Sequence, residues 1–240
     1  MKPRICILLN RFDEFDFEEA VRRHLPSDRF EVTIADTFPD DPSDYRLVIP
    51  WCYRKVIKHA ARAGNIVVMH SSELPDGRGW APIYHAFSEQ KAEYVISGIF
   101  AADEVDTGDV IVRARFTIEA GYTAPFVRAL DKELSVILVA KILEQWPDGL
   151  PVGARQAGSG SFRGRRHPKD NEIELSVPLI EMLPHLRGVE PAAPAFFFYM
   201  GVKYLIEVRP EIAPCKPRQV MIEYPALDKV EMWRGWHDSP

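Results

Sequence analysis

The first 63 residues contain no glycine, although apolar segments with strand-like and helix-like spacing already alternate there. Residues 4–9 read as a buried strand, and residues 15–24 have the spacing of a helix. Phosphate-binding loops of α/β enzymes need glycine, because their backbone N–H groups must approach the phosphate without an intervening Cβ. Neither GxGxxG nor GxxxxGK followed by serine or threonine occurs anywhere in the chain. A dinucleotide dehydrogenase and a P-loop nucleotide hydrolase are therefore not expected.

The alternation of strands and helices predicts an α/β protein with a Rossmann-like, mostly parallel sheet and helices on both faces. A boundary near residue 148 divides the chain into a core of residues 1–148 and a small, mainly β C-terminal subdomain of residues 149–240. In that second part, Gly158–Ser161 is expected to be a flexible loop. Strands are expected at 4–9, 30–35, 46–49, 66–69, 94–100 and 110–116, and helices at 15–24, 56–63, 81–89 and 125–146.

The charge, the apolar pattern and the cysteines indicate which partners and which cellular location to expect. With 30 Lys and Arg against 35 Asp and Glu, the net charge of -5 argues against a nucleic-acid partner. No apolar run reaches the roughly 18 residues of a membrane span, and the start lacks a signal-peptide cleavage pattern. Cys6, Cys52 and Cys215 lie far apart, so neither disulfides nor a thiolate metal site are expected. A reducing cytoplasm is the expected location.

Two polar loops follow neighbouring strands of the expected sheet. His70 ends the apolar run 66–69, and the loop from residue 71 to 82 reads SSELPDGRGWAP. The loop after the next strand, residues 102–109, reads ADEVDTGD. A strand-end histidine alone is more often structural, and Asp-Thr-Gly alone is often a plain turn. Because ligands bind at the carboxyl ends of strands in α/β sheets, the two loops together indicate a site.

These motifs resemble the signature of the formyltransferases that use N10-formyltetrahydrofolate, a family that includes methionyl-tRNA, glycinamide ribonucleotide and sugar-nucleotide enzymes. The signature is Asn-x-His, a loop with Leu-Pro-x-x-Arg-Gly, and a later Val-Asp-x-Gly. The resemblance covers roughly residues 1–145, and residues 165–170 resemble an Arg-x-x-Pro-x-Asp segment of small family members. The matching residues are His70, Ser72, Leu74, Pro75, Arg78, Gly79 and Pro82, followed by Val105, Asp106 and Gly108.

The resemblance implies an enzyme that transfers a formyl group, with catalytic roles for three residues. His70 is the base or oxyanion donor, and Asp106 orients it and assists proton transfer to the departing N10. Ser72 is the third catalytic candidate. The formyl donor, N10-formyltetrahydrofolate, is expected to bind beside eight residues, of which the basic ones face its anionic tail: Tyr53, Arg54, Lys55, Arg78, Ala102, Asp103, Glu104 and Val105.

One position departs from the family signature. The family's catalytic Asn falls on Val68, whose side chain has no hydrogen-bonding group. Losing one oxyanion donor typically costs roughly 10²–10³ in rate. Ser71, Ser72 and a backbone N–H of the 77–79 turn are the candidate replacements, and the sequence does not rank them. Residues 70–80 are similar to a branch of the family that also lacks this Asn.

The expected acceptor is the amine of an aminosugar nucleotide, which would place the enzyme in lipopolysaccharide or glycan biosynthesis. The short tail and the acidic charge disfavour tRNA. A homodimer is left open, with Trp233 and Trp236 as anchors of either the tail or an interface. Two alternatives also stay open: a catalytically impaired folate- or nucleotide-binding protein, and a formyltransferase for another small amine. The residues that would meet a diphosphate are Arg163, Arg165, Arg166 and Lys169.

Overall fold

A computed structural model describes residues 2–10, 14–51, 53, 55, 57 and 63–236. Its first half is built on a parallel sheet with the strand order β2-β1-β3. The strands are β1 (Arg4–Leu8), β2 (Glu31–Ala35) and β3 (Leu47–Pro50). A parallel bridge from Val48 to Ile66 connects this sheet to β4 (Val67–His70). The polar end of β4 therefore lies at the same edge as the ends of the parallel strands.

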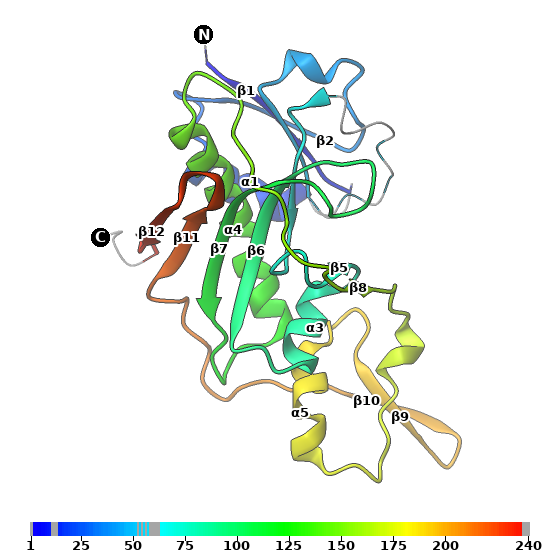
Figure 1. The fold of residues 1–240 in the computed structure, drawn as a ribbon. Helices are drawn as coiled ribbons and strands as arrows, with labels where there is room; N and C mark the ends of the chain where they lie inside the picture. The colour runs from blue at the N-terminus through cyan, green and yellow to red at the C-terminus, as the bar shows by residue number, and fades with distance from the viewer. Residues whose placement is uncertain are drawn as a thin grey trace.

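From β4 onward the sheet is antiparallel, with the order β12-β11-β7-β6-β4 (Figure 1). The α/β class is confirmed, but the sheet is mixed, and its parallel pairing is confined to the first half. Parallel strands need a crossover of a dozen or more residues, whereas only the short loop 101–109 joins β6 to β7. The strands are β6 (Glu93–Phe100), β7 (Val110–Thr117), β11 (Val220–Tyr224) and β12 (Lys229–Trp233).

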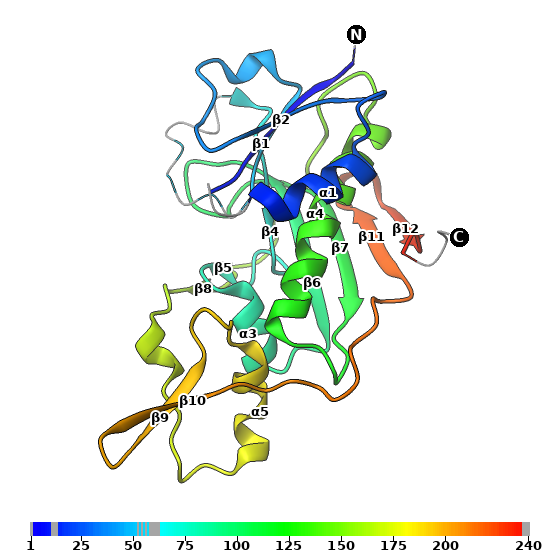
Figure 2. The same cartoon turned by 180° about the vertical axis from the view of Figure 1, so that it is seen from behind.

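Two helices pack against one another on one face of this sheet, α1 (Glu14–His24) and α4 (Ala124–Gln145) (Figure 2). The four-residue spacing that predicted α4 is confirmed, since Leu130, Leu134 and Leu138 are buried in the main core. The helix expected at 56–63 falls almost wholly outside the described residues. Among the described residues, no helix combines the length and apolarity that crossing a bilayer requires.

The chain beyond residue 148 contributes to the core and also forms a layer of its own. Its strand β11 pairs with β7, and Ile222 and Tyr224 are buried in the main core. The hairpin β9 (Ala195–Tyr199) and β10 (Val202–Ile206) projects from the other end of the molecule (Figure 1). The division into residues 1–148 and 149–240 stays a prediction. The remaining elements are η1 (Pro42–Asp44), β5 (Arg78–Gly79), α3 (Pro82–Ser88), β8 (Phe162–Arg163), η2 (Pro168–Asn171), α5 (Leu179–Gly188) and η3 (Pro225–Leu227).

A partly buried glutamate ties the C-terminal segment to the two packed helices. Glu133 on α4 accepts hydrogen bonds from His24 of α1 at 3.2 Å and from Lys216 at 2.6 Å. Burial opposes its ionisation, but these donors outweigh it and lower the pKa of Glu133 from 4.5 to about 2. Trp233 and Trp236 also pack edge to face, with ring centroids 4.9 Å apart, against the main core. The two tryptophans thus anchor the C-terminal segment to the core, which is one of the two roles that the sequence suggested for them. Whether the protein forms a homodimer stays a prediction.

We expect Glu133→Gln to lower the free energy of unfolding at pH 7 by about 3 kcal/mol, because a lowered carboxyl pKa stabilises the folded state. That contribution is present above pH 4.5 and is lost as the pH falls toward 2, so the variant and wild type should converge there. Urea unfolding at pH 7 and at pH 3 measures both effects. Glu144→Gln on the same helix is the control, since its pairs with Arg29 and Lys141 are more exposed. Equal losses in the two variants would contradict the assignment.

Candidate active site

His70 is buried at the end of β4, with 8% of its surface exposed. Successive side chains of a strand point to opposite faces, so Val68 and His70 share one face. Val67 and Met69 belong to the main core, whereas Val68 packs against a separate small cluster of Leu74, Ile99 and Val110. The position that carries the family's Asn therefore lies beside His70 but presents a methyl surface.

Both ring nitrogens of His70 face oxygen acceptors. Nδ1 lies 3.4 Å from Oδ2 of Asp106, and Nε2 lies 2.9 Å from the carbonyl oxygen of Gly77. A neutral imidazole has one N–H and can donate to one of these partners, whereas the protonated ring donates to both. With an N–H directed to Asp106, Nε2 is the atom that can take up a proton. Once Nε2 is protonated, it donates a hydrogen bond to the Gly77 carbonyl.

Asp106 is held in place by its backbone as well as by its carboxylate. Its φ of 57° lies in the left-handed region, and its Oδ2 accepts the backbone N–H of Gly79 at 2.9 Å. Two residues later, a Cβ at Gly108 would overlap the carbonyl oxygen of Phe100, so this turn needs glycine. The Asp-Thr-Gly turn thus carries a carboxylate to the histidine.

The candidate replacements for the missing Asn differ in what they already bind. The hydroxyl of Ser71 donates to Asp131 at 2.5 Å, and the N–H groups of Gly77 and Gly79 donate to Ser161 and Asp106. The buried Oγ of Ser72 has no hydrogen-bond partner among the described residues. It also lies against Gly77, which bonds to His70. Among these candidates, the hydroxyl of Ser72 is the one that has no hydrogen-bond partner among the described residues.

A buried carboxylate behind His70 was not predicted from the sequence. Asp131 on α4 is 2% exposed, and its Oδ2 accepts hydrogen bonds from Ser71 and from Tyr94, each at 2.5 Å. Burial, followed by the charge of Asp131, raises the pKa of Tyr94 well above its usual value, so the phenol remains a donor. The sequence signal that could have indicated this residue is that Asp131 is an acidic residue among the apolar residues of the longest expected helix.

A segment after residue 150 closes over the His70 loop, and we call residues 154–163 the strap. Its β8 pairs in parallel with β5, and Ser161 accepts the N–H of Gly77 on its Oγ at 2.9 Å. The expected flexible loop at Gly158–Ser161 is wrong for its second half, because a Cβ at Gly160 would overlap the carbonyl oxygen of Pro75. The glycine there permits close backbone contact rather than motion.

The strap also bonds to the turn that carries Asp106. The side-chain amide of Gln156 donates to the carbonyl oxygens of Asp106 and Gly108, both at 2.8 Å. Its oxygen accepts from Nη2 of Arg78 at 2.7 Å. Sequence reasoning missed Gln156 and Ser161, because neither lies in a motif and their partners are distant in the chain.

The described residues that were predicted to hold the folate lie in three places: at Tyr53 and Lys55, at Arg78, and in the turn before Asp106. Tyr53 and Lys55 both reach the carbonyl oxygen of Asp36, at 3.4 and 3.0 Å. Arg54 lies outside the described residues. Arg78 is tied to the strap, and its buried Nε has no partner among the described residues. The turn that precedes Asp106 is largely exposed and supplies the other four predicted residues: Ala102, Asp103, Glu104 and Val105.

Three of the four basic residues proposed for a diphosphate already have partners. Arg163 pairs with Glu89, Arg165 lies over the ring of Trp80 at 5.2 Å, and Arg166 lies over the ring of Tyr84 at 3.4 Å. All three partners lie on α3 or directly beside it in the chain. Their charge is therefore partly neutralised or spread over aromatic faces.

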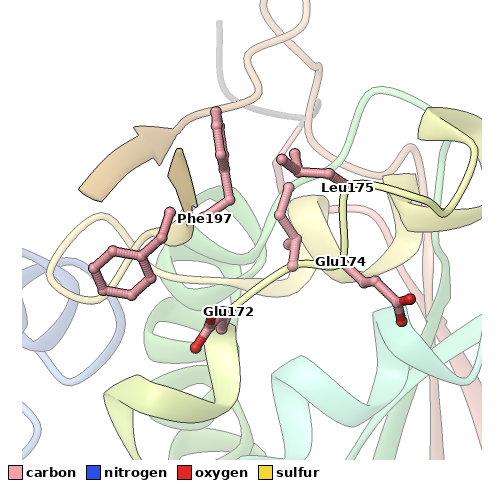
Figure 3. A pocket seen from close by; sticks show the side chains of 6 residues that line it. Glu172, Glu174, Leu175 and Phe197 are labelled. Carbon is pink, nitrogen blue, oxygen red and sulfur yellow. The ribbon is translucent and has the colours of Figure 1, made fainter. Parts of the chain in front are cut away.

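Two hollows lie away from His70. One of about 440 Å³ in the C-terminal part is lined by the two glutamates and the apolar residues shown in Figure 3. The other, of about 560 Å³, lies between Tyr122 and the segment around Cys215. Neither is lined by His70 or Asp106.

The chain is similar in sequence to methionyl-tRNA formyltransferases. It is 29% identical over 157 residues to that of Pelotomaculum thermopropionicum, a match that covers 64% of this chain and 50% of the relative. The chain spans about half the length of the curated relatives it matches. No model of a protein family matches it.

Solved structures share the fold over most of the chain. Methionyl-tRNA formyltransferase from Clostridium thermocellum superposes with a TM-score of 0.68 at 19% identity, covering 98% of this chain and all of that one. HypX from Aquifex aeolicus in complex with tetrahydrofolic acid gives 0.69 at 18%, covering 94% of this chain and 43% of that one. A sugar N-formyltransferase from a Shewanella species gives 0.66 at 14%, covering 89% and 100%. At these identities the structures establish the fold.

Proposed function

Because this chain is related in sequence to the formyltransferases that use N10-formyltetrahydrofolate and shares their fold, we propose that it transfers a formyl group from that folate to an amine. The observation that carries the proposal is the buried His70–Asp106 pair at the end of β4, with 3.4 Å between Nδ1 and Oδ2. The pair joins the two polar loops whose motifs resemble the family signature.

The attacking amine must lose a proton as it adds to the formyl carbon. Nε2 of His70 takes that proton, and the carboxylate of Asp106 holds the ring and stabilises the imidazolium. When the bond to N10 breaks, the imidazolium returns the proton to the departing nitrogen. Nε2 reaches the reacting nitrogen by exchanging its contact with the Gly77 carbonyl for one with the substrate.

The tetrahedral oxyanion needs a donor in place of the absent Asn. The hydroxyl of Ser72 fills this role, since it is buried beside Gly77 and has no other partner among the described residues. Val68 packs against Leu74, Ile99 and Val110, so the face of β4 that carries His70 is apolar, and apolar surroundings strengthen hydrogen bonds.

The residues present fit the folate donor. Arg78 Nε and Ser72 Oγ are buried polar atoms without partners among the described residues, as expected where a polar ligand completes the site. Tyr53, Arg54, Lys55 and Arg78 would hold the donor together with residues 102–105, the basic side chains meeting its carboxylates. When bound, N10-formyltetrahydrofolate supplies an activated formyl group.

We further propose an aminosugar nucleotide as the acceptor, in glycan or lipopolysaccharide biosynthesis. The structural match to the Shewanella sugar N-formyltransferase supports an acceptor of this class, although the methionyl-tRNA formyltransferase chain is covered just as fully. The net charge of -5 disfavours a nucleic acid as the substrate. Another small amine remains the second acceptor class. Val68 supports the competing reading of a folate-binding protein without turnover. The cytoplasmic location stays a prediction from the cysteine pattern.

The acceptor is tested by incubating the purified chain with N10-formyltetrahydrofolate and separate acceptors, while absorbance follows the release of tetrahydrofolate. We expect turnover with a 4-amino-4,6-dideoxyhexose nucleotide and none above background with initiator methionyl-tRNA. The free aminosugar without its nucleotide is the matched control and should react more slowly. Turnover with methionyl-tRNA alone would reject the aminosugar acceptor. Folate binding by calorimetry without turnover on any amine would favour the competing reading.

A further inference from the structure

Gln156 cross-links the two loops that bring His70 and Asp106 together. Its amide nitrogen donates to two backbone carbonyls of the Asp106 turn, and its oxygen accepts from Arg78 in the His70 loop. The three distances lie between 2.7 and 2.8 Å, which is the range of well-formed hydrogen bonds. Gln156 lies 50 residues beyond Asp106 and 78 beyond Arg78, so the bonds are tertiary.

The chemistry of these three partners fits glutamine and excludes its acidic analogue. Two carbonyl oxygens need donors, and a guanidinium needs an acceptor, which a primary amide supplies at its two ends. A glutamate at residue 156 would keep the bond to Arg78 but would direct an oxygen at two carbonyl oxygens. Both amide hydrogens are therefore used in holding the backbone of the turn.

The backbone held in this way is the part of the site that most needs support. Asp106 has a φ of 57°, a left-handed conformation that is unfavourable for a residue with a side chain. Its carbonyl oxygen is bonded to Gln156, while its carboxylate is bonded to the N–H of Gly79 and faces His70. The direction of the carboxylate follows from the backbone conformation that the amide stabilises.

We propose that Gln156 is a positioning residue for the formyl-transfer site, which holds the Asp106 turn so that its carboxylate meets Nδ1 of His70. The inference deepens the proposed function and rests on it for its catalytic consequence. The strap therefore takes part in assembling the catalytic pair and is more than a connection between the core and the C-terminal part.

Three variants separate this role from a general effect on folding. Gln156→Ala removes all three bonds, and Gln156→Glu keeps the size and the bond to Arg78 but loses both donors. Arg155→Ala is the matched control, because it changes the exposed neighbour in the same strap. Thermal unfolding is measured for all three, and each is compared with wild type at the same pH.

The first readout needs no substrate. In protein labelled with ¹⁵N-histidine, the ring signals of His70 are identified by their loss in His70→Asn. We expect both Gln156 variants to shift the Nδ1 signal of His70 in the direction that Asp106→Asn shifts it, and Arg155→Ala to leave it unchanged. Ring signals of His70 that coincide with wild type in both Gln156 variants would overturn the proposal.

The second readout is steady-state kinetics. We expect Gln156→Ala and Gln156→Glu to lower kcat about tenfold or more with little change in KM for the formyl donor, since small misplacements of catalytic groups affect the chemical step. Values of kcat within twofold of wild type would also reject the proposal. If wild type shows no turnover with any amine, the proposed function fails, while the NMR readout still decides whether Gln156 positions the pair.

Discussion

His70→Asn is expected to lower kcat/KM for formyl transfer by about 10³-fold, because it removes the group that takes the proton from the attacking amine. Asparagine is shorter than histidine, and its amide N–H lies near the position of Nδ1, so it can still donate to Asp106, which Nδ1 faces at 3.4 Å. The thermal unfolding midpoint should therefore stay within a few degrees of wild type. The measurement is the initial rate of tetrahydrofolate release under saturating formyl donor.

His85→Asn provides the matched control for this prediction. His85 is a second partly buried histidine beside a carboxylate, with Nδ1 at 3.5 Å from Glu89. Burial, followed by the charge of Arg163, lowers its pKa. Because His85 lies on α3, outside the His70–Asp106 pair, its replacement should leave turnover within about twofold. Equal turnover of His70→Asn and wild type would show that the pair is structural.

The resemblance to the formyltransferase signature implied that Asp106 orients His70, and in the structure Nδ1 of His70 lies 3.4 Å from Oδ2 of Asp106. The strand expected at 66–69 agrees with β4 within one residue at each end, and the two polar loops that were expected to form a site meet at one edge of the sheet. The spacing of four in residues 125–146 likewise predicted α4 within one residue at each end. The predictions of β4 and α4 needed only neighbours along the chain, whereas the pairing of His70 with Asp106 came from the resemblance.

The parts that the sequence did not predict depend on contacts between distant residues. The antiparallel direction of β6 and β7 depends on which strands become neighbours in the sheet. The strand β11 pairs with β7, which lies more than 100 residues earlier in the chain. Gln156 and Ser161 become informative only when the strap lies on the His70 loop. A Gly-Ser-Gly-Ser run is typical of a flexible loop, and the glycine at residue 160 is instead required by backbone contact.

Ser72→Ala is expected to lower kcat by about 10²-fold, the cost typical of removing one oxyanion donor, with little change in KM for either substrate. The hydroxyl is buried and has no partner among the described residues, so its loss should leave the folded state nearly unchanged. Ser71→Ala is the adjacent control. Ser71→Ala removes a donor to the buried Asp131. It should therefore lower the unfolding midpoint more than Ser72→Ala does, and lower kcat less.

Val68→Asn provides the complementary test, because residue 68 shares the face of His70 and lies where the resembled family has its Asn. In the Ser72→Ala background, the new amide should recover at least tenfold of the lost kcat, since it restores a donor beside the imidazole. The variant also places a polar group against Leu74, Ile99 and Val110, so its unfolding is measured in parallel. A Ser72→Ala variant as fast as wild type would remove Ser72 from the mechanism. A folded double variant with no more activity than Ser72→Ala would reject residue 68 as a position from which a donor reaches the oxyanion.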